Sequence, residues 1–401
     1  MIAHAGVMLA FHAPHAVAST RPASRKRILV LSVSAGAGHV RAAEAIRSCA
    51  QRHGENVEAI HLDVMDYVPA AFRKLYTDFY IALVNRHPAV WGYLYRITDE
   101  ARPDSLLQKV RRAAERLNTR RLHAQIAAFR PDAIVCTHFL PAELLSRVAG
   151  LDCSLWVQVT DFDLHRMWVH EGITGYFAAN EEVAFRLRAH GVAAQAVRVT
   201  GIPIMPGFGK PPGRGECARA IGLDAKRPTV LLMGGGAGLG RLDSLAARLL
   251  AVDGEVQLIA MAGKNLAMLA ALRKLAERYP GRLVAQGFTD QVERLMACAD
   301  IAVTKPGGLS TSECLAMRLP MILNSPIPGQ EERNADFLLE EGVALKASDA
   351  VTLEYRVRQL LAQPGRLASM RDNAARVARP GAAGDVLATV LSHPSIRSAC
   401  P

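Results

Sequence analysis

The stretch at residues 301–338, IAVTKPGGLSTSECLAMRLPMILNSPIPGQEERNADFL, decides the fold class of this chain. It holds two short apolar runs, at 301–303 and 320–323, and each run suits a buried strand. A turn rich in glycine or proline follows each run, and a segment with helix-starting residues follows each turn. Strand, loop and helix repeated in this order predict an α/β domain with a parallel sheet.

The first of the two helix starts has the features of an anion-binding site. Gly307 and Gly308 form the turn after the strand, and Ser310 and Thr311 are expected to cap the helix. Unpaired backbone N–H groups and the positive end of the helix dipole then face one point, which suits a diphosphate. Lys305 adds a positive charge beside that point.

Carboxylate and amide side chains follow at positions suited to sugar hydroxyls. Glu313 is expected in the first turn of the first helix, where its carboxylate can accept hydrogen bonds from two neighbouring hydroxyls, as on a ribose. On the second helix, which should begin near Gln330, the side chains of Gln330, Glu331 and Asn334 share one face. Each feature taken singly also fits an ordinary strand–loop–helix connection, and only the whole ordered string favours a binding site.

The segments TKPGG…E, at 304–313, and PGQEERN, at 328–334, resemble the two donor-binding motifs of glycosyltransferase family 28. This family includes the monogalactosyldiacylglycerol synthases and the bacterial diacylglycerol glucosyltransferases. The resemblance implies the GT-B fold, in which two Rossmann-like domains face each other across a cleft. It also implies that Glu313 holds the ribose, that Gly307, Gly308 and the Ser310/Thr311 turn hold the diphosphate, and that Gln330, Glu331 and Asn334 contact the hexose.

A similar unit opens the chain, with an apolar strand at 25–33 and a glycine-rich loop through Gly36 and Gly38 that ends at His39. Arg41 stands where the dinucleotide fingerprint needs its third glycine, which disfavours NAD. A neutral imidazole at this helix start could act as a general base or hold a phosphate, and a structural role is the alternative. Family 28 enzymes carry a glycine-rich loop ending in histidine at this place, which favours the functional role.

The chain departs from the family at one position and matches it at others. Plant-type members have an aspartate five residues before the histidine, where this chain has Ser34, so that partner is absent. The segment TDFDLH at 160–165 resembles a family segment and implies that Asp161 and His165 face the cleft as alternative or orienting catalytic groups. Asp161 could also be a helix or turn cap.

The crossing at 200–213 is rich in glycine and proline and is the expected hinge between two domains. We therefore predict a disordered tail at 1–24, an acceptor- and membrane-binding domain at 25–205, and a UDP-sugar-binding domain at 206–390. In the second domain a glycine-rich loop begins at Gly234 and Gly235, where backbone approaches a ligand or the loop is mobile. The resemblance implies that the loop around Phe288 holds the uracil.

The composition points to an anionic partner. The formal net charge of +11 over 401 residues indicates nucleic acid, a phosphorylated ligand or an acidic membrane. No recognisable nucleic-acid motif accompanies the charge, which disfavours a nucleic-acid-binding module. Seven scattered cysteines without a CxxC pair indicate a reducing cytosol rather than a disulfide framework. No run of eighteen apolar residues occurs, so membrane contact should be peripheral.

Residues 67–97 concentrate aromatic and basic side chains in a chain that is only 5% aromatic. This pattern suits a lipid interface, or a helical insertion that packs its rings inward. Lipid-directed members of family 28 carry a comparable insertion, which favours the membrane. A basic stripe follows on a helix within 105–130 and is either membrane-facing or solvated. The expected acceptor and membrane residues are Gly36, Gly38, Trp91, Tyr93, Arg112 and Arg116, and the stripe also holds Lys109 and Arg120.

Residues and resemblance together predict an inverting hexosyltransferase that uses a UDP-sugar and acts on a lipid hydroxyl, with 1,2-diacylglycerol as the expected acceptor. His39 would take the acceptor proton, and helix ends with Lys305 would stabilise the leaving diphosphate. We expect no cofactor and no bound metal, and a peripheral location on the cytoplasmic face of the membrane. The alternatives are a peptidoglycan-precursor transferase that uses UDP-N-acetylglucosamine, and a UDP-sugar 2-epimerase.

Overall fold

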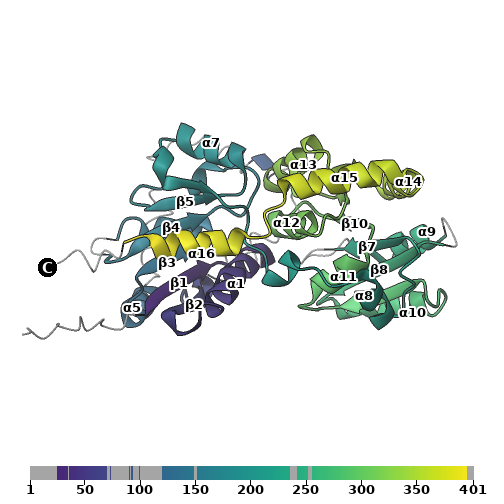
Figure 1. Ribbon diagram of the computed structural model, residues 1–401, viewed down its shortest axis with the longest axis horizontal. Coiled ribbons are helices and arrows are strands. Elements are labelled where there is room, and N and C mark those ends of the chain that lie inside the picture. Colours follow the sequence, from purple (N-terminus) through teal and green to yellow (C-terminus); the bar gives the residue numbers. More distant parts are fainter. Residues whose placement is uncertain are drawn as a thin grey trace, which may run out of the picture.

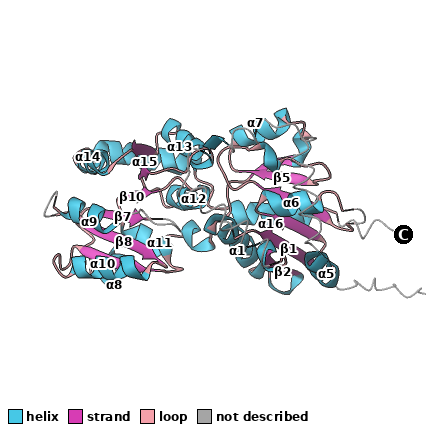
Figure 2. Ribbon diagram, turned by 180° about the vertical axis from the view of Figure 1, so that it is seen from behind, coloured by secondary structure: helices cyan, strands magenta, loops and turns pink. Residues whose placement is uncertain are grey.

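The computed structural model describes residues 25–34, 36–69, 120–148, 151–234, 242–251 and 255–394, together with Arg73, Val90, Gly92, Tyr93 and Asp99. Within them the chain forms two parallel sheets of six strands each, covered by helices (Figures 1 and 2). The strand orders are β2-β1-β3-β4-β5-β6 and β12-β11-β10-β7-β8-β9. The predicted α/β class with two Rossmann-like units is confirmed.

The inner strands β3, β4 and β5 of the first sheet are buried on both faces, as a parallel sheet between helix layers requires, and the edge strands β2 and β6 are partly exposed. Its apolar residues divide into two clusters, one on each face. The elements are β1 Lys26–Ser32, α1 Ala37–Gln51, η1 Gly54–Asn56, β2 Val57–Asp63, η2 Val64–Asp66, α5 Arg120–Phe129, β3 Ala133–Cys136, α6 Phe139–Leu145, β4 Ser154–Gln158, η3 Arg166–Trp168, β5 Gly175–Ala178, α7 Glu181–Ala189, η4 Ala194–Ala196 and β6 Val197–Val199.

The second sheet repeats this plan after the crossing at 200–213. Its elements are η5 Pro206–Gly209, α8 Arg214–Ala220, β7 Thr229–Met233, α9 Leu242–Leu250, β8 Gln257–Gly263, α10 Leu266–Ala276, β9 Leu283–Gly287, α11 Val292–Cys298, β10 Ile301–Thr304, α12 Gly308–Ala316, β11 Met321–Asn324, α13 Gln330–Glu340, β12 Ala344–Ala347, α14 Ala350–Leu361 and α15 Pro364–Val377. The predicted strand at 301–303 and the predicted helix start at Gln330 are confirmed.

The last helix, α16 Ala382–Ser392, returns to the first sheet. Its apolar residues Val386, Leu387 and Val390 are buried in one cluster with Ile28 and Val30 of β1. Figure 1 shows it in yellow, lying across the first sheet while α15 stays with the second. The expected second domain at 206–390 therefore contains one helix that packs on the first domain. Burial of this apolar face accounts for the return.

Helix α12 begins earlier than predicted. Gly307 is its N-cap residue, and no side chain caps it. Thr311 lies inside the helix, where its hydroxyl donates to the carbonyl of Gly307 at 2.8 Å. The expected cap by Ser310 and Thr311 is therefore wrong, because the helix already begins at Gly308, with Gly307 as its extended N-cap residue. Glu313 consequently lies in the second turn and not in the first.

Several predicted features fall outside the described residues. They are the tail at 1–24, most of the aromatic segment at 67–97, Gly235, Trp91, and the stripe residues Lys109, Arg112 and Arg116. Among the residues that the structure describes, no helix combines the length and the apolar character needed to cross a membrane.

Candidate active site

The two sheets meet at their carboxyl edges, where ligands bind in open α/β sheets. Helix α1 follows β1 at one edge and α12 follows β10 at the other, and the two helix starts are in contact. A side chain at Gly38 would place its Cβ 3.6 Å from Cβ of Leu309 on α12. About one turn further along both helices, Nη2 of Arg41 lies 3.8 Å from Oε1 of Glu313. The predicted acceptor loop, with Gly36 as N-cap of α1, therefore lies against the predicted donor helix.

Gly308 is the point of closest approach between the two units. A Cβ at this position would lie 2.1 Å from the carbonyl oxygen of Thr160 and 3.2 Å from Cδ1 of Ile202, both in the predicted first domain. No side chain fits there without moving backbone. Gly308 thus has a packing role at the contact between the sheets, beside its predicted role at a diphosphate. Gly307, its neighbour, lies near Oε1 of Glu331.

His39 is held by two threonines that the sequence analysis did not single out as site residues. Its Nδ1 lies 2.9 Å from the carbonyl oxygen of Thr137 and 2.9 Å from Oγ1 of Thr160. Because a carbonyl oxygen only accepts hydrogen bonds, Nδ1 carries the proton and Nε2 is the acceptor of the neutral ring. Burial lowers the pKa of His39, while the charge of Asp161 and the bond to Thr137 act in the opposite direction. The ring is therefore neutral, and its role as a base stays a prediction.

An uncharged aromatic wall surrounds His39. The His138 ring meets it edge to face at 4.6 Å, and Trp168 lies 6.3 Å from both histidines. Nδ1 of His138 accepts from the backbone N–H of Leu140 and so caps α6. Burial, with His39 close by, holds the pKa of His138 well below its usual range. This wall keeps a second positive charge away from His39.

His165 occupies a capping position. Its Nδ1 accepts from the backbone N–H of Met167 at the start of η3, and its Nε2 lies 3.9 Å from Oδ1 of Asp99. The ring is buried. These contacts account for its burial and orientation, and its catalytic role stays a prediction.

Asp161 is buried and bound from the other domain by two amide side chains predicted to contact the hexose. Nε2 of Gln330 donates to its two oxygens at 2.8 and 2.9 Å, and Nδ2 of Asn334 donates at 3.1 Å. Oδ1 of Asn334 accepts from the backbone N–H of Phe162 at 2.8 Å. Burial raises the pKa of Asp161, and the amide donors oppose this. In this structure Gln330 and Asn334 therefore hold the two units together.

Arg333 extends these contacts, although the sequence analysis did not select it. Its Nη1 lies 2.6 Å from Oδ2 of Asp163 and 3.2 Å from Oδ2 of Asp99. Arg186 also pairs with Asp163, at 3.0 Å. We call the contacts between Gln330, Arg333 and Asn334 of α13 and Asp99, Asp161 and Asp163 of the first half the α13 latch. Its three α13 members share one helix face by their i, i+3 and i, i+4 spacing.

The two acidic residues predicted to bind the donor, Glu313 and Glu331, each interact with a neighbouring group of the protein. Glu313 is buried, which raises the pKa of its carboxyl to about 7, while the charge of Arg41 acts in the opposite direction. Oε2 of Glu331 accepts from the backbone N–H of Ile327 at 2.7 Å and so fixes the loop before α13. Burial also raises the pKa of Glu331, against the nearby charge of Lys305.

Phe288 lies directly after β9, and its side chain is 66% exposed. Nζ of Lys264 lies 5.1 Å from the centre of the ring. An exposed ring with a cation beside it offers a flat apolar face and a charge to a planar ligand. Gly234 follows β7 at the same sheet edge. These positions are compatible with the predicted uracil site, which stays a prediction.

Two family models match the chain. The one described as monogalactosyldiacylglycerol (MGDG) synthase matches residues 39–204, and the one described as glycosyltransferase family 28 C-terminal domain matches residues 229–386. The chain is 28% identical over 354 residues to the processive diacylglycerol beta-glucosyltransferase of Bacillus pumilus, covering 87% of this chain and 90% of that relative. The protein of the same name from Bacillus subtilis is 27% identical, with 87% and 91% covered.

Solved structures show the same fold at lower identity. The structure of Acinetobacter baumannii MurG has a TM-score of 0.59 at 15% identity and covers 92% of this chain and 100% of that one. The Neisseria meningitidis UDP-GlcNAc 2-epimerase, bound to UDP-GlcNAc, has a TM-score of 0.58 at 12% identity, with the same coverage. Similarity at these identities establishes the fold alone, and that fold is the predicted GT-B arrangement of two Rossmann-like domains.

Proposed function

The chain belongs to glycosyltransferase family 28, and from this premise we propose that it transfers a hexose from a UDP-sugar to the hydroxyl of a 1,2-diacylglycerol with inversion at the anomeric carbon. The family makes the protein a UDP-sugar-dependent hexosyltransferase, as the sequence predicted. The observation that supports transfer to an acceptor hydroxyl is the position and hydrogen bonding of the His39 ring. Its Nδ1 is bound to the Thr137 carbonyl and lies beside the hydroxyl of Thr160, whose own carbonyl touches Gly308 at the start of the donor helix.

His39 is the base in this proposal. Because Nδ1 is held by the Thr137 carbonyl, Nε2 accepts the acceptor proton while the hydroxyl oxygen attacks the anomeric carbon. The pKa of the ring is lowered by burial, so the ring is neutral and able to accept at neutral pH. Asp161 then stabilises the imidazolium by its charge, since its carboxylate interacts electrostatically with the ring.

The leaving group is a nucleoside diphosphate on the second domain. The start of α12, at Gly307 and Gly308, supplies backbone N–H groups and a positive dipole end, and Lys305 supplies a charge. Glu313 is the expected partner of the ribose, and Phe288 is the expected neighbour of the uracil. Because Gly308 already touches the Thr160 carbonyl, we infer that donor entry separates the two units and loosens the α13 latch.

The acceptor would reach the cleft from a membrane surface. Two described residues of the aromatic segment, Val90 and Tyr93, are 49% and 56% exposed. Gly92 lies between them, so close to Pro328 that a Cβ there would be 3.0 Å from the proline Cβ. Gly92 thus borders the loop that leads into α13. Exposed aromatic and apolar side chains beside the cleft support delivery of a lipid hydroxyl from an anionic membrane.

The test is to incubate the protein with UDP-glucose, UDP-galactose or UDP-glucuronate, with and without diacylglycerol in phosphatidylglycerol vesicles. We expect a glycolipid in mass spectra and a β-linked sugar by NMR, and UDP release only when diacylglycerol is present. Consumption of the UDP-sugar without lipid, or an epimerised nucleotide sugar, would contradict the proposal.

His39→Ala tests the base in the same assay. It should lower turnover by roughly 10²–10⁴-fold and leave UDP affinity nearly unchanged, because the nucleotide is expected on the other domain. His53→Ala is the matched control, since His53 is an exposed histidine just after the same helix. Near-normal turnover of His39→Ala would assign His39 a structural role.

A further inference from the structure

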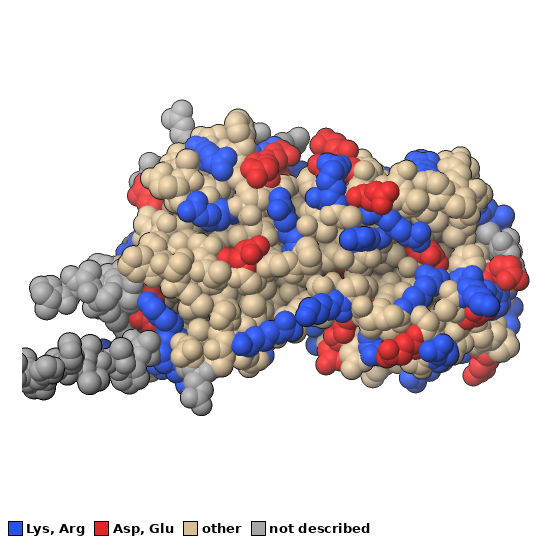
Figure 3. All heavy atoms as spheres, in the orientation of Figure 1, with Lys and Arg blue, Asp and Glu red and all other residues tan. Residues whose placement is uncertain are grey.

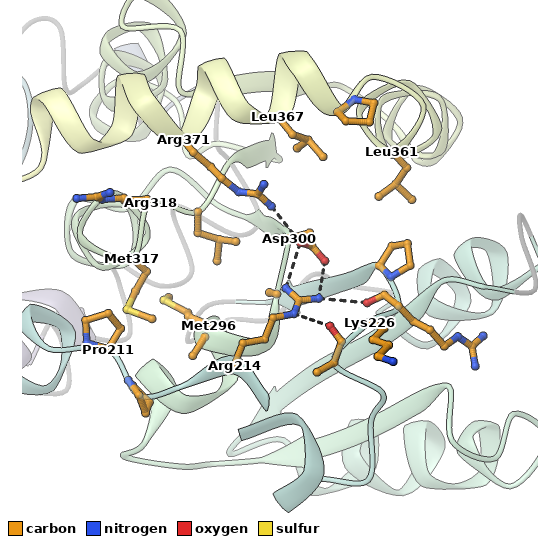
Figure 4. Close-up of a pocket in the computed structure, with 18 residues that line it drawn as sticks. Pro211, Arg214, Lys226, Met296, Asp300, Met317, Arg318, Leu361, Leu367 and Arg371 are labelled. Atoms are coloured by element: carbon orange, nitrogen blue, oxygen red, sulfur yellow. Dashed lines mark hydrogen bonds and ion pairs between the residues drawn. The ribbon is translucent and has the colours of Figure 1, made fainter. Parts of the chain in front are cut away.

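A cavity of about 650 Å³ lies at the amino edge of the second sheet, at the opposite edge from the candidate active site. Its walls are the segments that precede β7, β10 and β11, together with the start of α8 and the α14–α15 corner. Figure 4 shows this space between α15, which carries Leu367 and Arg371 above it, and the residues Arg214 and Lys226 below it. Its volume is in the range of small-molecule sites.

The cavity is lined by cations. Arg214 and Arg371 come from opposite walls and share the carboxylate of Asp300, at 2.8 and 3.0 Å (Figure 4). One carboxylate between two guanidinium groups leaves a positive charge, and further cations lie on the same walls. The cationic lining residues are Arg214, Lys226, Arg227, Arg318 and Arg371, and Asp300 is the acidic residue among the lining side chains. In Figure 3 basic side chains are exposed on the lobe that carries the second sheet, interspersed with acidic ones.

Arg318 holds an unusual backbone conformation to reach this wall. It ends α12 in a Schellman motif, with its N–H bound to the Leu315 carbonyl and the N–H of Leu319 bound to the Cys314 carbonyl. Its φ is 52°, in the left-handed region where glycine is the unstrained choice. An exposed arginine at this position brings a guanidinium to the cavity at the expense of backbone strain.

The remaining wall is apolar. Met296 and Met317 come from the ends of α11 and α12, and Leu361 and Leu367 come from the α14–α15 corner. Methionine side chains adapt their shape to a ligand, and the leucines offer a fixed surface. The cavity is therefore amphipathic, with guanidinium and ammonium groups beside a hydrocarbon surface.

We propose that this cavity is a second ligand site, which binds an organic phosphate with an apolar substituent. The phosphate would lie beside Arg371, because a guanidinium group matches the oxygens of a phosphate with paired N–H donors. Arg318 and Lys226, which Figure 4 shows on opposite sides of the cavity, would add to the positive potential around it. The substituent would lie against the methionine and leucine wall. Both a phospholipid headgroup with its chains and a water-soluble phosphorylated metabolite have this chemistry. The site does not depend on the transfer reaction proposed above.

Calorimetry with octyl phosphate, in saturating UDP, tests the site on the full chain. We expect octyl phosphate to bind at least about tenfold more tightly than inorganic phosphate, which has the charge alone, and more tightly than octanol, which has the chain alone. The double variant Lys226→Gln/Arg318→Gly should weaken octyl phosphate by at least about tenfold, equal to 1.4 kcal/mol. Arg273→Gln, at an exposed position on α10, is the matched control and should bind like wild type.

Arg318→Gly alone separates binding from folding. Glycine adopts the left-handed conformation without strain, so this variant should unfold at the same or a higher temperature than wild type while it binds octyl phosphate less tightly. The proposal is overturned if octyl phosphate does not bind, if inorganic phosphate binds as tightly, if UDP displaces it, or if the pocket variants bind like Arg273→Gln.

Vesicle flotation distinguishes the two sources of the phosphate. If the ligand is a lipid headgroup, the double variant should float less than Arg273→Gln with phosphatidylcholine vesicles that contain phosphatidic acid. If the ligand is a soluble metabolite, both variants should float alike while only the double variant loses octyl phosphate. Either result, together with the calorimetry, supports the site.

Discussion

Replacing Glu313 by glutamine should make the protein more stable at neutral pH and weaken its binding of nucleotide. The carboxyl is buried on α12, which raises its pKa from 4.5 to about 7, and Arg41 at 3.8 Å only partly opposes this. In the unfolded chain the same group ionises at its ordinary pKa. Between these two values the folded protein therefore binds more protons than the unfolded chain does.

The sign and size of the effect follow from proton linkage. Where the native state holds the extra proton, the free energy of unfolding falls as the pH rises, by 1.36 kcal/mol per pH unit for one proton. Below pH 4.5 the Glu313 carboxyl is protonated in both states and does not lower the stability of the folded protein. Above about pH 7 it is ionised in both states, and the cost of burying the charge lowers the stability in full. Over this window the wild-type protein loses roughly 3 kcal/mol of its free energy of unfolding. The gain of the glutamine variant is smaller than this, because the variant also loses the attraction between Glu313 and Arg41.

Urea unfolding followed by tryptophan fluorescence from about pH 5 to about pH 8 measures this loss. The stability of Glu313→Gln relative to wild type should increase with pH and reach its highest value above pH 7. Glu277→Gln, at an exposed position after α10, is the control and should follow wild type at every pH. Calorimetry should show weaker UDP binding by the Glu313 variant, by about 1 kcal/mol for each lost hydrogen bond. A stability difference that does not change with pH would refute the reasoning.

Three further predictions follow from contacts around the site. Thr160→Val removes the hydroxyl that lies beside Nδ1 of His39, while the Thr137 carbonyl still binds this nitrogen. The kcat should therefore fall by about 3- to 10-fold with the KM for the donor unchanged, and Thr160→Ser should restore kcat. Gly308→Ala places a Cβ 2.1 Å from the Thr160 carbonyl, so small-angle scattering should show a larger radius of gyration, and a radius equal to wild type would contradict the tight contact. Arg333→Gln removes the pairs with Asp163 and Asp99 and should enlarge the radius of gyration in the absence of ligand, whereas Arg273→Gln should not.

The inner strands were predictable because each is a short run of apolar residues that is buried on both faces. The run at 301–303 became β10, and the run at 320–323 became β11. The edge strands β6 and β12 were not predicted, because a charged residue interrupts the apolar run in each of them. The return of α16 to the first sheet could not be read from its sequence, since an apolar helix face does not specify which sheet covers it.

The site was predictable at its motifs and not at their partners. His39 was found because it ends a glycine-rich loop after a strand, but the groups that hold its ring lie 98 and 121 residues away in the sequence. A signal for them was present: Thr137 and Thr160 both follow the ends of neighbouring strands, and such positions meet at one edge of a parallel sheet. Applying that rule to every strand end would have placed both threonines beside His39.

The α13 latch changes how mutations in the QEERN segment should be interpreted. Gln330 and Asn334 donate to Asp161 here, so a hexose hydroxyl that used the same amides would replace a bond to a carboxylate. Each exchange has a small net free energy, since one hydrogen bond is broken for each one formed. Gln330→Ala therefore alters both domain closure and sugar binding, and its effect on affinity cannot be assigned to the sugar alone. Arg333→Gln weakens the latch without removing a residue expected at the donor. Comparing the two variants thus separates the closure contribution from hexose recognition.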